Sequence, residues 1–411
     1  MVWQPIIEIS KRGVFLDKLS EIADTLLKNM PQFKSNSGIV SDRIGVVLLL
    51  FYYAKFTGDD KYAEMAYELI SLVFDELNED IAGGSFERSA NGLAGVGWTL
   101  EHLEQNGFLE IDTNELLGEV DELIHQLMVV DMRKKNYDYL DGALNRGLYF
   151  LNRFKNPVSP TYLLELANLL AEESDHDRPG ELKFLANVPD PSGKDQFVCN
   201  IGMSHGSASI VWFLSKVVEL GLSEKVPAIL NGFMNYIWRQ EQDIAQRLSY
   251  FPFLVVDNGP PSDSRLGWCY GDLGIGVALW QGSRSLGHKE WQEKTKQILL
   301  HCATRRELKK NSVVDAGMCH GTAGNAHMFN RMYHYTGLVD SKEAACYWLD
   351  ETIKMAHFDD GYAGFKCWKG EDAGGWKNAA DIFDGVAGIG LSLLAAVSDI
   401  EPAWDRVLLL S

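Results

Sequence analysis

Two cysteines and two histidines in this sequence lie just before glycines, in similar settings. The stretch MCHGTAGN, residues 318–325, places Cys319 beside His320 and continues with a Gly-x-x-Gly pair. The stretch RLGWCYGDLG, residues 265–274, places Cys269 two residues before a glycine, as Cys319 is. Thiolates and imidazoles are ligands that zinc prefers, and a set of two cysteines and one histidine leaves a fourth position open for catalysis. These three residues are therefore a candidate zinc site.

The adjacency of Cys319 and His320 constrains the backbone that carries them. Neighbours inside a regular helix point about 100° apart, so the two side chains could not both reach one ion from there. A turn just before a helix removes this limit, and Gly321 permits such a turn. We expect a two-point metal clamp at a helix entrance, with Cys269 as the third ligand. The remaining cysteines show no such placement and are expected to be ordinary core residues: Cys199, Cys302, Cys346 and Cys367.

A second histidine occupies the same position in another glycine motif. His205 precedes Gly206 as His320 precedes Gly321, but a serine stands where Cys319 would be. His205 could be a fourth ligand. A residue that transfers protons from outside the metal shell is more useful if zinc must keep one position open, so we expect an acid/base role for it.

The glycine motifs belong to a pattern that recurs along the chain. A glycine, small residues and a long apolar run begin at seven places, of which the first and third are degenerate: Val40, Gly92, Gly142, Gly206, Gly271, Gly321 and Gly385. Amphipathic helical stretches such as residues 16–27 lie between the copies. A helix that is apolar on all sides should be buried. The pattern predicts an all-α fold: an α/α toroid of about seven helix-pair repeats, with the glycine-rich ends of the inner helices at one rim.

No linker long enough to separate domains is evident, so residues 1–411 are expected to form a single toroid domain. Loop insertions are expected at about 175–200, 255–265 and 357–378, over the end of the barrel where function concentrates. Within the last insertion, residues 358–368 are expected to form a small hairpin.

Composition excludes several classes of protein. The formal net charge is −19 and there is no run of basic residues, which argues against nucleic-acid binding. No stretch of about 20 uncharged apolar residues is present, so no membrane span is expected. The N-terminus lacks the apolar segment of a signal peptide, and six cysteines in 411 residues make no disulfide framework. A cytoplasmic location is the expectation.

The motifs resemble those of the LanC-like lanthionine cyclases. The residues that carry the resemblance are the sevenfold glycine repeat and, in this order, Gly202-x-x-His205-Gly206, Trp268-Cys269-Tyr270-Gly271 and Cys319-His320-Gly321-x-x-Gly324. The resemblance runs from about Gly38 to the C-terminus. It implies an α/α toroid that binds one zinc ion per chain through Cys269, Cys319 and His320. It also implies thioether formation, in which a cysteine thiol adds to a dehydrated Ser or Thr of a ribosomal precursor peptide, with a dehydratase as a candidate partner.

The resemblance further suggests roles around the metal. Addition of a thiolate to an α,β-unsaturated amide generates an enolate that needs a proton at its α carbon, and His205 is placed to supply it. Arg265 matches the family's arginine, and it or Tyr270 could stabilise the enolate oxygen. Asp138 matches the family's aspartate and would orient the histidine, with Asp141 as a close rival.

Two departures from the family pattern and three alternative functions stay open. Ser209 and Asn145 stand where smaller residues are typical, which bears on substrate access. The alternatives are a protein that binds or transfers a small thiol such as glutathione, a non-catalytic peptide-binding subunit stapled by zinc, and a glycosidase-type toroid. The last would need paired carboxylates, for which the candidates near glycine motifs are Asp138, Asp141, Asp272 and Asp384.

Overall fold

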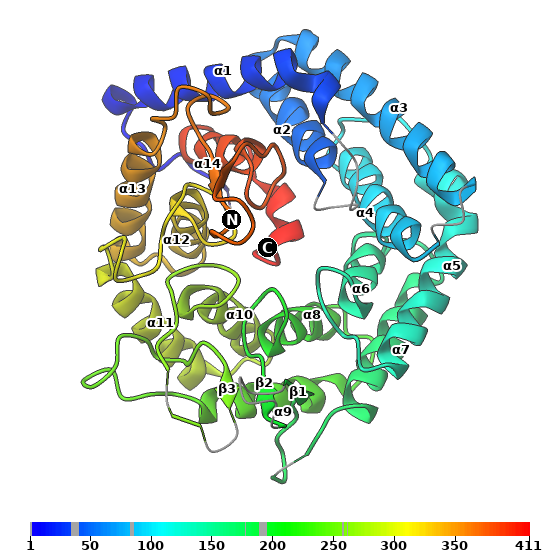
Figure 1. The fold of residues 1–411 in the computed structure, drawn as a ribbon. Coiled ribbons are helices and arrows are strands. Elements are labelled where there is room, and N and C mark those ends of the chain that lie inside the picture. The colour runs from blue at the N-terminus through cyan, green and yellow to red at the C-terminus, as the bar shows by residue number, and fades with distance from the viewer. Residues whose placement is uncertain are drawn as a thin grey trace. The chain divides into compact units, whose positions relative to one another are not determined.

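The computed structural model describes residues 2–33, 41–82, 86–176, 178–188, 195–256, 259–260 and 262–411. Fourteen α-helices lie in these residues (Figure 1). The chain divides into two compact units: a first unit of Met1–Thr113, Arg306–Leu409 and Ser411, and a second unit of Asn114–Arg305 and Leu410. The expectation of one domain stays a prediction. The expected insertions lie outside the described residues at 177, 189–194, 257, 258 and 261.

The first unit pairs apolar helices with amphipathic ones. Its helices are α1 (Arg12–Asn29), α2 (Asp42–Thr57), α3 (Asp60–Ala82), α4 (Phe86–Gln105), α12 (Thr322–Thr336), α13 (Val339–Lys354) and α14 (Val386–Val397). Every residue of α14 is buried, whereas α1 and α13 bury only one face. Figure 1 shows α14 between α12 and α2, and these helices pack together in that order. The apolar helices therefore form the core of this unit, as the repeat pattern predicted.

The second unit repeats this arrangement. Its helices are α5 (Thr113–Arg133), α6 (Ala143–Asn152), α7 (Ser159–Glu172), α8 (Ser207–Glu219), α9 (Val226–Arg239), α10 (Asp272–Ser285) and α11 (Lys289–Thr304). The buried helix α8 packs against α6, α9 and α10. A small antiparallel sheet joins the insertions in the order β1 (Ala186–Asn187), β2 (Phe197–Cys199) and β3 (Val255–Val256), with Val198 opposite both Ala186 and Val256.

The predicted hairpin at residues 358–368 is wrong in its bounds. Its two strands are β4 (Cys367–Trp368) and β5 (Trp376–Lys377), so only the last residues of the predicted segment are extended. The preceding residues form tight turns, closed by the Phe358 N–H on the Gly364 carbonyl at 2.9 Å. Ala363 and Gly364 both have positive φ, which coils the chain back on itself and prevents a strand there. Short 3₁₀ helices complete the described structure: η1 (Ile9–Lys11), η2 (Met30–Gln32) and η4 (Ala403–Leu408).

Glycine precedes five of the buried helices because a side chain would not fit there, and not because the backbone torsion angles require glycine. The N-cap residues of α6, α8, α10, α12 and α14 are Gly142, Gly206, Gly271, Gly321 and Gly385, and all have extended backbone. A Cβ at Gly321 would lie 2.3 Å from the Gly317 nitrogen, and one at Gly385 would lie 2.2 Å from the Asp381 nitrogen. The chain doubles back too closely for any side chain, so these glycines provide space for a close backbone approach and do not adopt unusual dihedrals.

The first two copies of the repeat differ from the others. Helix α2 begins after Ser41, whose hydroxyl accepts the Ile44 N–H at 3.3 Å; Val40 lies outside the described residues. Helix α4 begins at Phe86, so the Gly92 motif lies inside the helix rather than before it.

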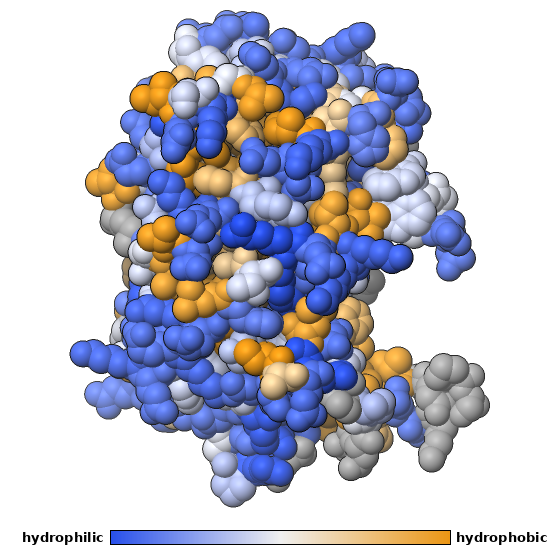
Figure 2. All heavy atoms as spheres, turned by 90° about the vertical axis from the view of Figure 1, so that its left-hand side faces the viewer, coloured by the Kyte–Doolittle hydropathy of each residue, from blue (hydrophilic) through white to orange (hydrophobic). Residues whose placement is uncertain are grey.

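One face of the molecule is mostly hydrophilic. Figure 2 shows one face of the molecule, on which hydrophilic side chains predominate and hydrophobic ones form separate small groups. Within the described residues, no helix combines the length and the hydrophobicity that crossing a membrane requires.

Candidate functional site

Five loops of seven residues lead into the glycine N-caps, and the predicted site residues all lie in them. We call them entrance loops; they are 136–142, 200–206 and 265–271 in the second unit, and 315–321 and 379–385 in the first. In four of them the N–H that follows the glycine donates to the carbonyl of the loop's first residue at 3.0–3.1 Å. The two residues before the glycine are Leu140-Asp141, Ser204-His205, Cys269-Tyr270, Cys319-His320 and Phe383-Asp384. The entrance loops therefore share one backbone conformation, and the side chains at the two positions before the glycine differ from loop to loop.

His205 and Asp138 form the tightest polar contact of the second unit's entrance loops. The Nδ1 atom of His205 lies 2.5 Å from Oδ2 of Asp138. The other carboxylate oxygen accepts the Leu140 N–H at 2.6 Å and the Asp141 N–H at 3.4 Å, which holds the carboxylate in its own loop. The side chains of His205 and Asp138 are 38% and 18% exposed, so the imidazole reaches solvent while its partner is shielded.

This contact perturbs the protonation of the histidine. The hydrogen bond to Asp138 raises the pKa of His205, burial opposes the rise, and the charges of Asp138, Asp141 and Cys269 add to it. Of the two aspartates considered, Asp138 is the one whose carboxylate contacts His205. Its part in catalysis stays a prediction.

Cys269 and Tyr270 lie against the loop that carries His205. The Cys269 carbonyl accepts the N–H groups of Met203 at 2.9 Å and Ser204 at 3.4 Å. A Cβ at Gly202 would lie 2.3 Å from that carbonyl oxygen, so only glycine lets the two loops interlock. The second unit thus joins a buried thiol, Cys269, to the loop of the histidine–carboxylate pair.

The phenol of Tyr270 is held from two sides. Asn200 donates from its amide to the phenolic oxygen at 3.3 Å, and the ring of Phe253 packs against the tyrosine at 4.7 Å between centroids. The ring of His205 is 6.0 Å from that of Tyr270. Sequence reasoning missed Asn200 and Phe253; Asn200 was detectable as a polar residue that opens its loop, as Asn136 and Asp315 open theirs.

Arg265 begins the loop of Cys269 and is half-buried. Its backbone pairs with Gly271 in an isolated bridge, and a Cβ on Gly271 would lie 2.4 Å from the Arg265 carbonyl oxygen. These contacts explain the position of its backbone. The role of its guanidinium stays a prediction.

In the first unit, Cys319 and His320 lie at the entrance of α12, as predicted. Both are half-buried, and the Cys319 sulfur lies within 4.8 Å of a ring nitrogen of His320. The Phe383 carbonyl accepts the N–H groups of Met318 at 2.6 Å and Cys319 at 2.9 Å. The pair is therefore held on a turn, where neighbouring side chains can point the same way.

The family model for lanthionine synthetase C-like proteins matches residues 37–409. The chain belongs to this family. Among solved structures, nisin cyclase is similar with a TM-score of 0.74 and 15% identity over 96% of this chain and 97% of that one. The predicted fold class, an all-α toroid of helix pairs, is confirmed by this match. Glutathione S-transferase LANCL1 of Danio rerio is 26% identical over 150 residues, and the chain spans only 34% of that relative's length.

Two residues depart from the pattern expected of the family, and both are buried inside helices. The Ser209 hydroxyl donates to the Gly206 carbonyl at 2.7 Å within the first turn of α8. Asn145 is 4% exposed in α6. Neither side chain projects into open space from its helix, which weakens the expectation that they govern access.

The other two aspartates near glycine motifs, Asp272 and Asp384, form ion pairs within the fold. Asp272 is fully buried, lies 3.0 Å from the guanidinium of Arg305, and accepts the N–H groups of Tyr250 and Phe251. Asp384 pairs with Lys369 at 2.5 Å. A glycosidase needs two carboxylates facing a sugar. These two are engaged in ion pairs instead, which argues against that alternative.

The cysteines outside the entrance loops behave largely as expected. Cys199, Cys302 and Cys367 are buried and Cys346 is half-buried. Burial raises the pKa of Cys367 to about 11, so its thiol is protonated at neutral pH.

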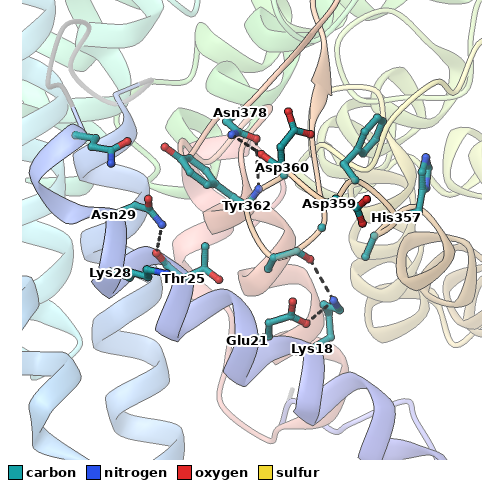
Figure 3. Close-up of a pocket in the computed structure, with 16 residues that line it drawn as sticks. Lys18, Glu21, Thr25, Lys28, Asn29, His357, Asp359, Asp360, Tyr362 and Asn378 are labelled. Atoms are coloured by element: carbon teal, nitrogen blue, oxygen red, sulfur yellow. Dashed lines mark hydrogen bonds and ion pairs between the residues drawn. The ribbon is translucent and has the colours of Figure 1, made fainter.

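A pocket of about 660 Å³ in the first unit was not predicted from the sequence. It lies between α1 and the turns of residues 356–364, and none of the predicted site residues lines it (Figure 3). Lys18 pairs with Glu21 of the same helix at 2.5 Å and reaches the opposite wall by donating to the Ala363 carbonyl at 3.1 Å. Its lining carries both basic and acidic side chains.

Proposed function

We propose that this chain closes thioether rings in a dehydrated ribosomal peptide, by adding cysteine thiols to dehydrated Ser or Thr. The observation that carries the proposal is the junction of two entrance loops in the second unit. There the His205–Asp138 pair and Cys269 belong to loops joined by two hydrogen bonds. A proton donor and a metal ligand in one rigid junction suit a reaction that needs both a thiolate and a proton.

We propose further that Cys269, Cys319 and His320 together hold one zinc ion. The donor set fits zinc, because soft thiolates and an imidazole favour it over magnesium or calcium. Three protein donors leave a fourth position, where the bound metal would take up a peptide thiol as its thiolate.

Residues of this chain would donate the proton to the enolate carbon and stabilise the enolate oxygen. Asp138 occupies Nδ1 of His205, so proton transfer runs through Nε2. The raised pKa enlarges the protonated fraction of His205 near neutral pH, which suits an acid that protonates the α carbon of the enolate. The carbon–sulfur bond forms as the carbon–carbon double bond is lost, and the carbon gains the proton that the thiol loses. Tyr270 and Arg265 are our candidates to stabilise the enolate oxygen.

The substrate of this reaction implies further partners. A dehydratase must first remove water from Ser or Thr of the precursor peptide, so such an enzyme is the expected supplier. A reducing compartment such as the cytoplasm would keep the peptide thiols available for addition.

A second candidate function is the binding or transfer of a small thiol. The similarity to glutathione S-transferase LANCL1 of Danio rerio favours it. The same zinc site could hold the glutathione sulfur in place of a peptide sulfur, so the two candidates differ in which thiol adds.

One assay separates these candidates. A dehydrated peptide that retains its cysteines is incubated with the protein, and thiols are then counted by alkylation and mass. Ring closure should remove alkylatable thiols at constant mass, even with excess glutathione. The variant Cys319→Ala should not exceed the uncatalysed background, and Cys346→Ala, which changes a cysteine on α13 outside the entrance loops, should behave as wild type. A peptide that gains the mass of glutathione would favour the transferase, and persistence of thiols would favour a non-catalytic binding subunit.

A further inference from the structure

A buried carboxylate lies beneath the turn that ends at the entrance of α14. Asp381 is 9% exposed, and its Oδ1 accepts the N–H groups of Phe383 at 2.7 Å and Asp384 at 2.8 Å. Two hydrogen bonds to one carboxylate oxygen fix the turn, and with it the direction of the Phe383 carbonyl.

The Phe383 carbonyl in turn holds the loop of the candidate zinc ligands. It accepts the N–H groups of Met318 and Cys319, at 2.6 and 2.9 Å. The two loops are in close contact, because a Cβ at Gly317 would lie 3.1 Å from both the Phe383 oxygen and the Asp384 Cα. A continuous chain of hydrogen bonds therefore runs from the Asp381 carboxylate through Phe383 to the backbone of Cys319.

We propose that Asp381 is a positioning residue for zinc: by orienting the Phe383 carbonyl, it fixes the backbone from which Cys319 presents its sulfur. This inference rests on the proposed function, since it concerns the same metal site. Groups that orient metal ligands from outside the coordination sphere contribute strongly to affinity, because a free ligand must otherwise be ordered as the metal binds.

Asp138 is the counterpart of Asp381 in the second unit. Each lies four residues before its N-cap glycine, and each gives Oδ1 to the second and third N–H groups after it. Asp138 differs because its other oxygen binds His205. The other three entrance loops have glycine at this position: Gly202, Gly267 and Gly317. Asp138 is therefore a matched control for Asp381, because it makes the same two hydrogen bonds in the other unit. Glycine is a replacement that the loop tolerates, because three other entrance loops carry it at this position.

The test measures zinc affinity by competition with a chromophoric chelator. Asp381→Ala should bind zinc about 10–100-fold more weakly than wild type, the usual effect of losing an orienting partner. Asp381→Asn keeps an oxygen acceptor and should recover most of the affinity. Asp138→Ala should bind zinc as wild type does while losing activity. Equal affinities for Asp381→Ala and wild type, or an equal loss in Asp138→Ala, would overturn the proposal, as would failure of Asp381→Asn to recover affinity.

Amide exchange in the zinc-free protein provides a readout that does not depend on the metal. Hydrogen exchange at Met318 and Cys319 should be faster in Asp381→Ala than in wild type, and near wild type in Asp381→Asn. If the wild type binds no zinc, the proposed function fails, and exchange still decides whether Asp381 holds the loop. If Asp381→Ala does not fold, Asp381→Gly tests the same loss, because three entrance loops carry glycine there; unchanged exchange in it would overturn the proposal.

Discussion

Two junctions between entrance loops, one in each unit, share a backbone and differ in their side chains. In the second unit, the Cys269 carbonyl accepts the N–H groups of Met203 and Ser204. In the first unit, the Phe383 carbonyl accepts those of Met318 and Cys319. In both cases the acceptor lies two residues before its N-cap glycine, and the donors lie two and three residues before theirs.

The difference between the junctions lies in which side chains the shared backbone carries. In the second unit, the donor loop carries His205 and the acceptor loop carries Cys269. In the first, the donor loop carries Cys319 and His320, while the acceptor loop carries Phe383 and no ligand. Because the carbonyl contacts involve only backbone, the residues before the glycine can change without loss of the junction. Under the proposed function, the second unit's junction carries the proton donor and one metal ligand, and the first unit's junction carries the other two ligands.

The largest effect is expected from the ligands of the proposed metal site. Cys319→Ala should lose most of its zinc, since the two remaining donors hold the ion poorly, and Cys269→Ala should do the same. Elemental analysis of the purified proteins measures this. Cys346→Ala is the control and should retain about one zinc per chain. If both ligand variants retained a full equivalent of zinc, the assignment of Cys269 and Cys319 as zinc ligands would be wrong.

A large effect on rate without loss of metal is expected at His205. His205→Asn should keep zinc and the fold, yet lose roughly 10²–10⁴ in the rate of ring closure, the usual contribution of acid–base catalysis. Single-turnover kinetics together with zinc content measures both quantities. A zinc-free variant would instead make His205 a ligand, and the division of labour between the two junctions would be wrong.

A smaller effect on rate is expected at the partner of that histidine. Asp138→Asn should lower kcat by about 10–100-fold, because the imidazole remains but its orientation and charge are less well supported. KM and zinc content should change little. Asp141→Asn is the matched control. The Asp141 carboxylate lies near the His205–Asp138 pair but does not make the hydrogen bond to His205 that Asp138 makes. A greater loss in Asp141→Asn would show that the rival aspartate has the functional role.

The smallest effect is a pH dependence of stability in the first unit. Burial, and next the neighbouring charge of Asp384, raise the pKa of Asp381 to about 7. The folded state then holds this proton more tightly than the unfolded state, so its contribution to stability falls as pH rises from the ordinary aspartate range to about 7. Asp381→Asn has no proton to lose there. Its melting temperature relative to wild type should increase from pH 5 to pH 8 in zinc-free protein, and a constant difference would contradict the prediction.

The sequence alone predicted the elements and the residues of the candidate site. Apolar runs after glycines and amphipathic stretches between them are local patterns, and local patterns specify helices and their buried faces. The placement of Cys269, Cys319 and His205 before glycines followed from counting along the chain. The predicted helices and their glycine entrances are found in the structure because near neighbours in sequence set them, whereas the metal and catalytic roles of these residues stay predictions.

Contacts between distant residues were decided only by the tertiary structure. The sequence argument chose Asp138 and left Asp141 as a close rival. In the structure the Asp138 carboxylate contacts His205, because its own turn presents one oxygen to backbone and the other to a loop 67 residues away. The support of Cys319 by Asp381 likewise passes through the carbonyl of Phe383, and a backbone carbonyl carries no signal in the sequence. The need for glycine at Gly202 and Gly317 was also decided by the tertiary structure, because a Cβ there would lie 2.3 Å from the Cys269 carbonyl oxygen and 3.1 Å from the Phe383 carbonyl oxygen, in loops distant along the chain.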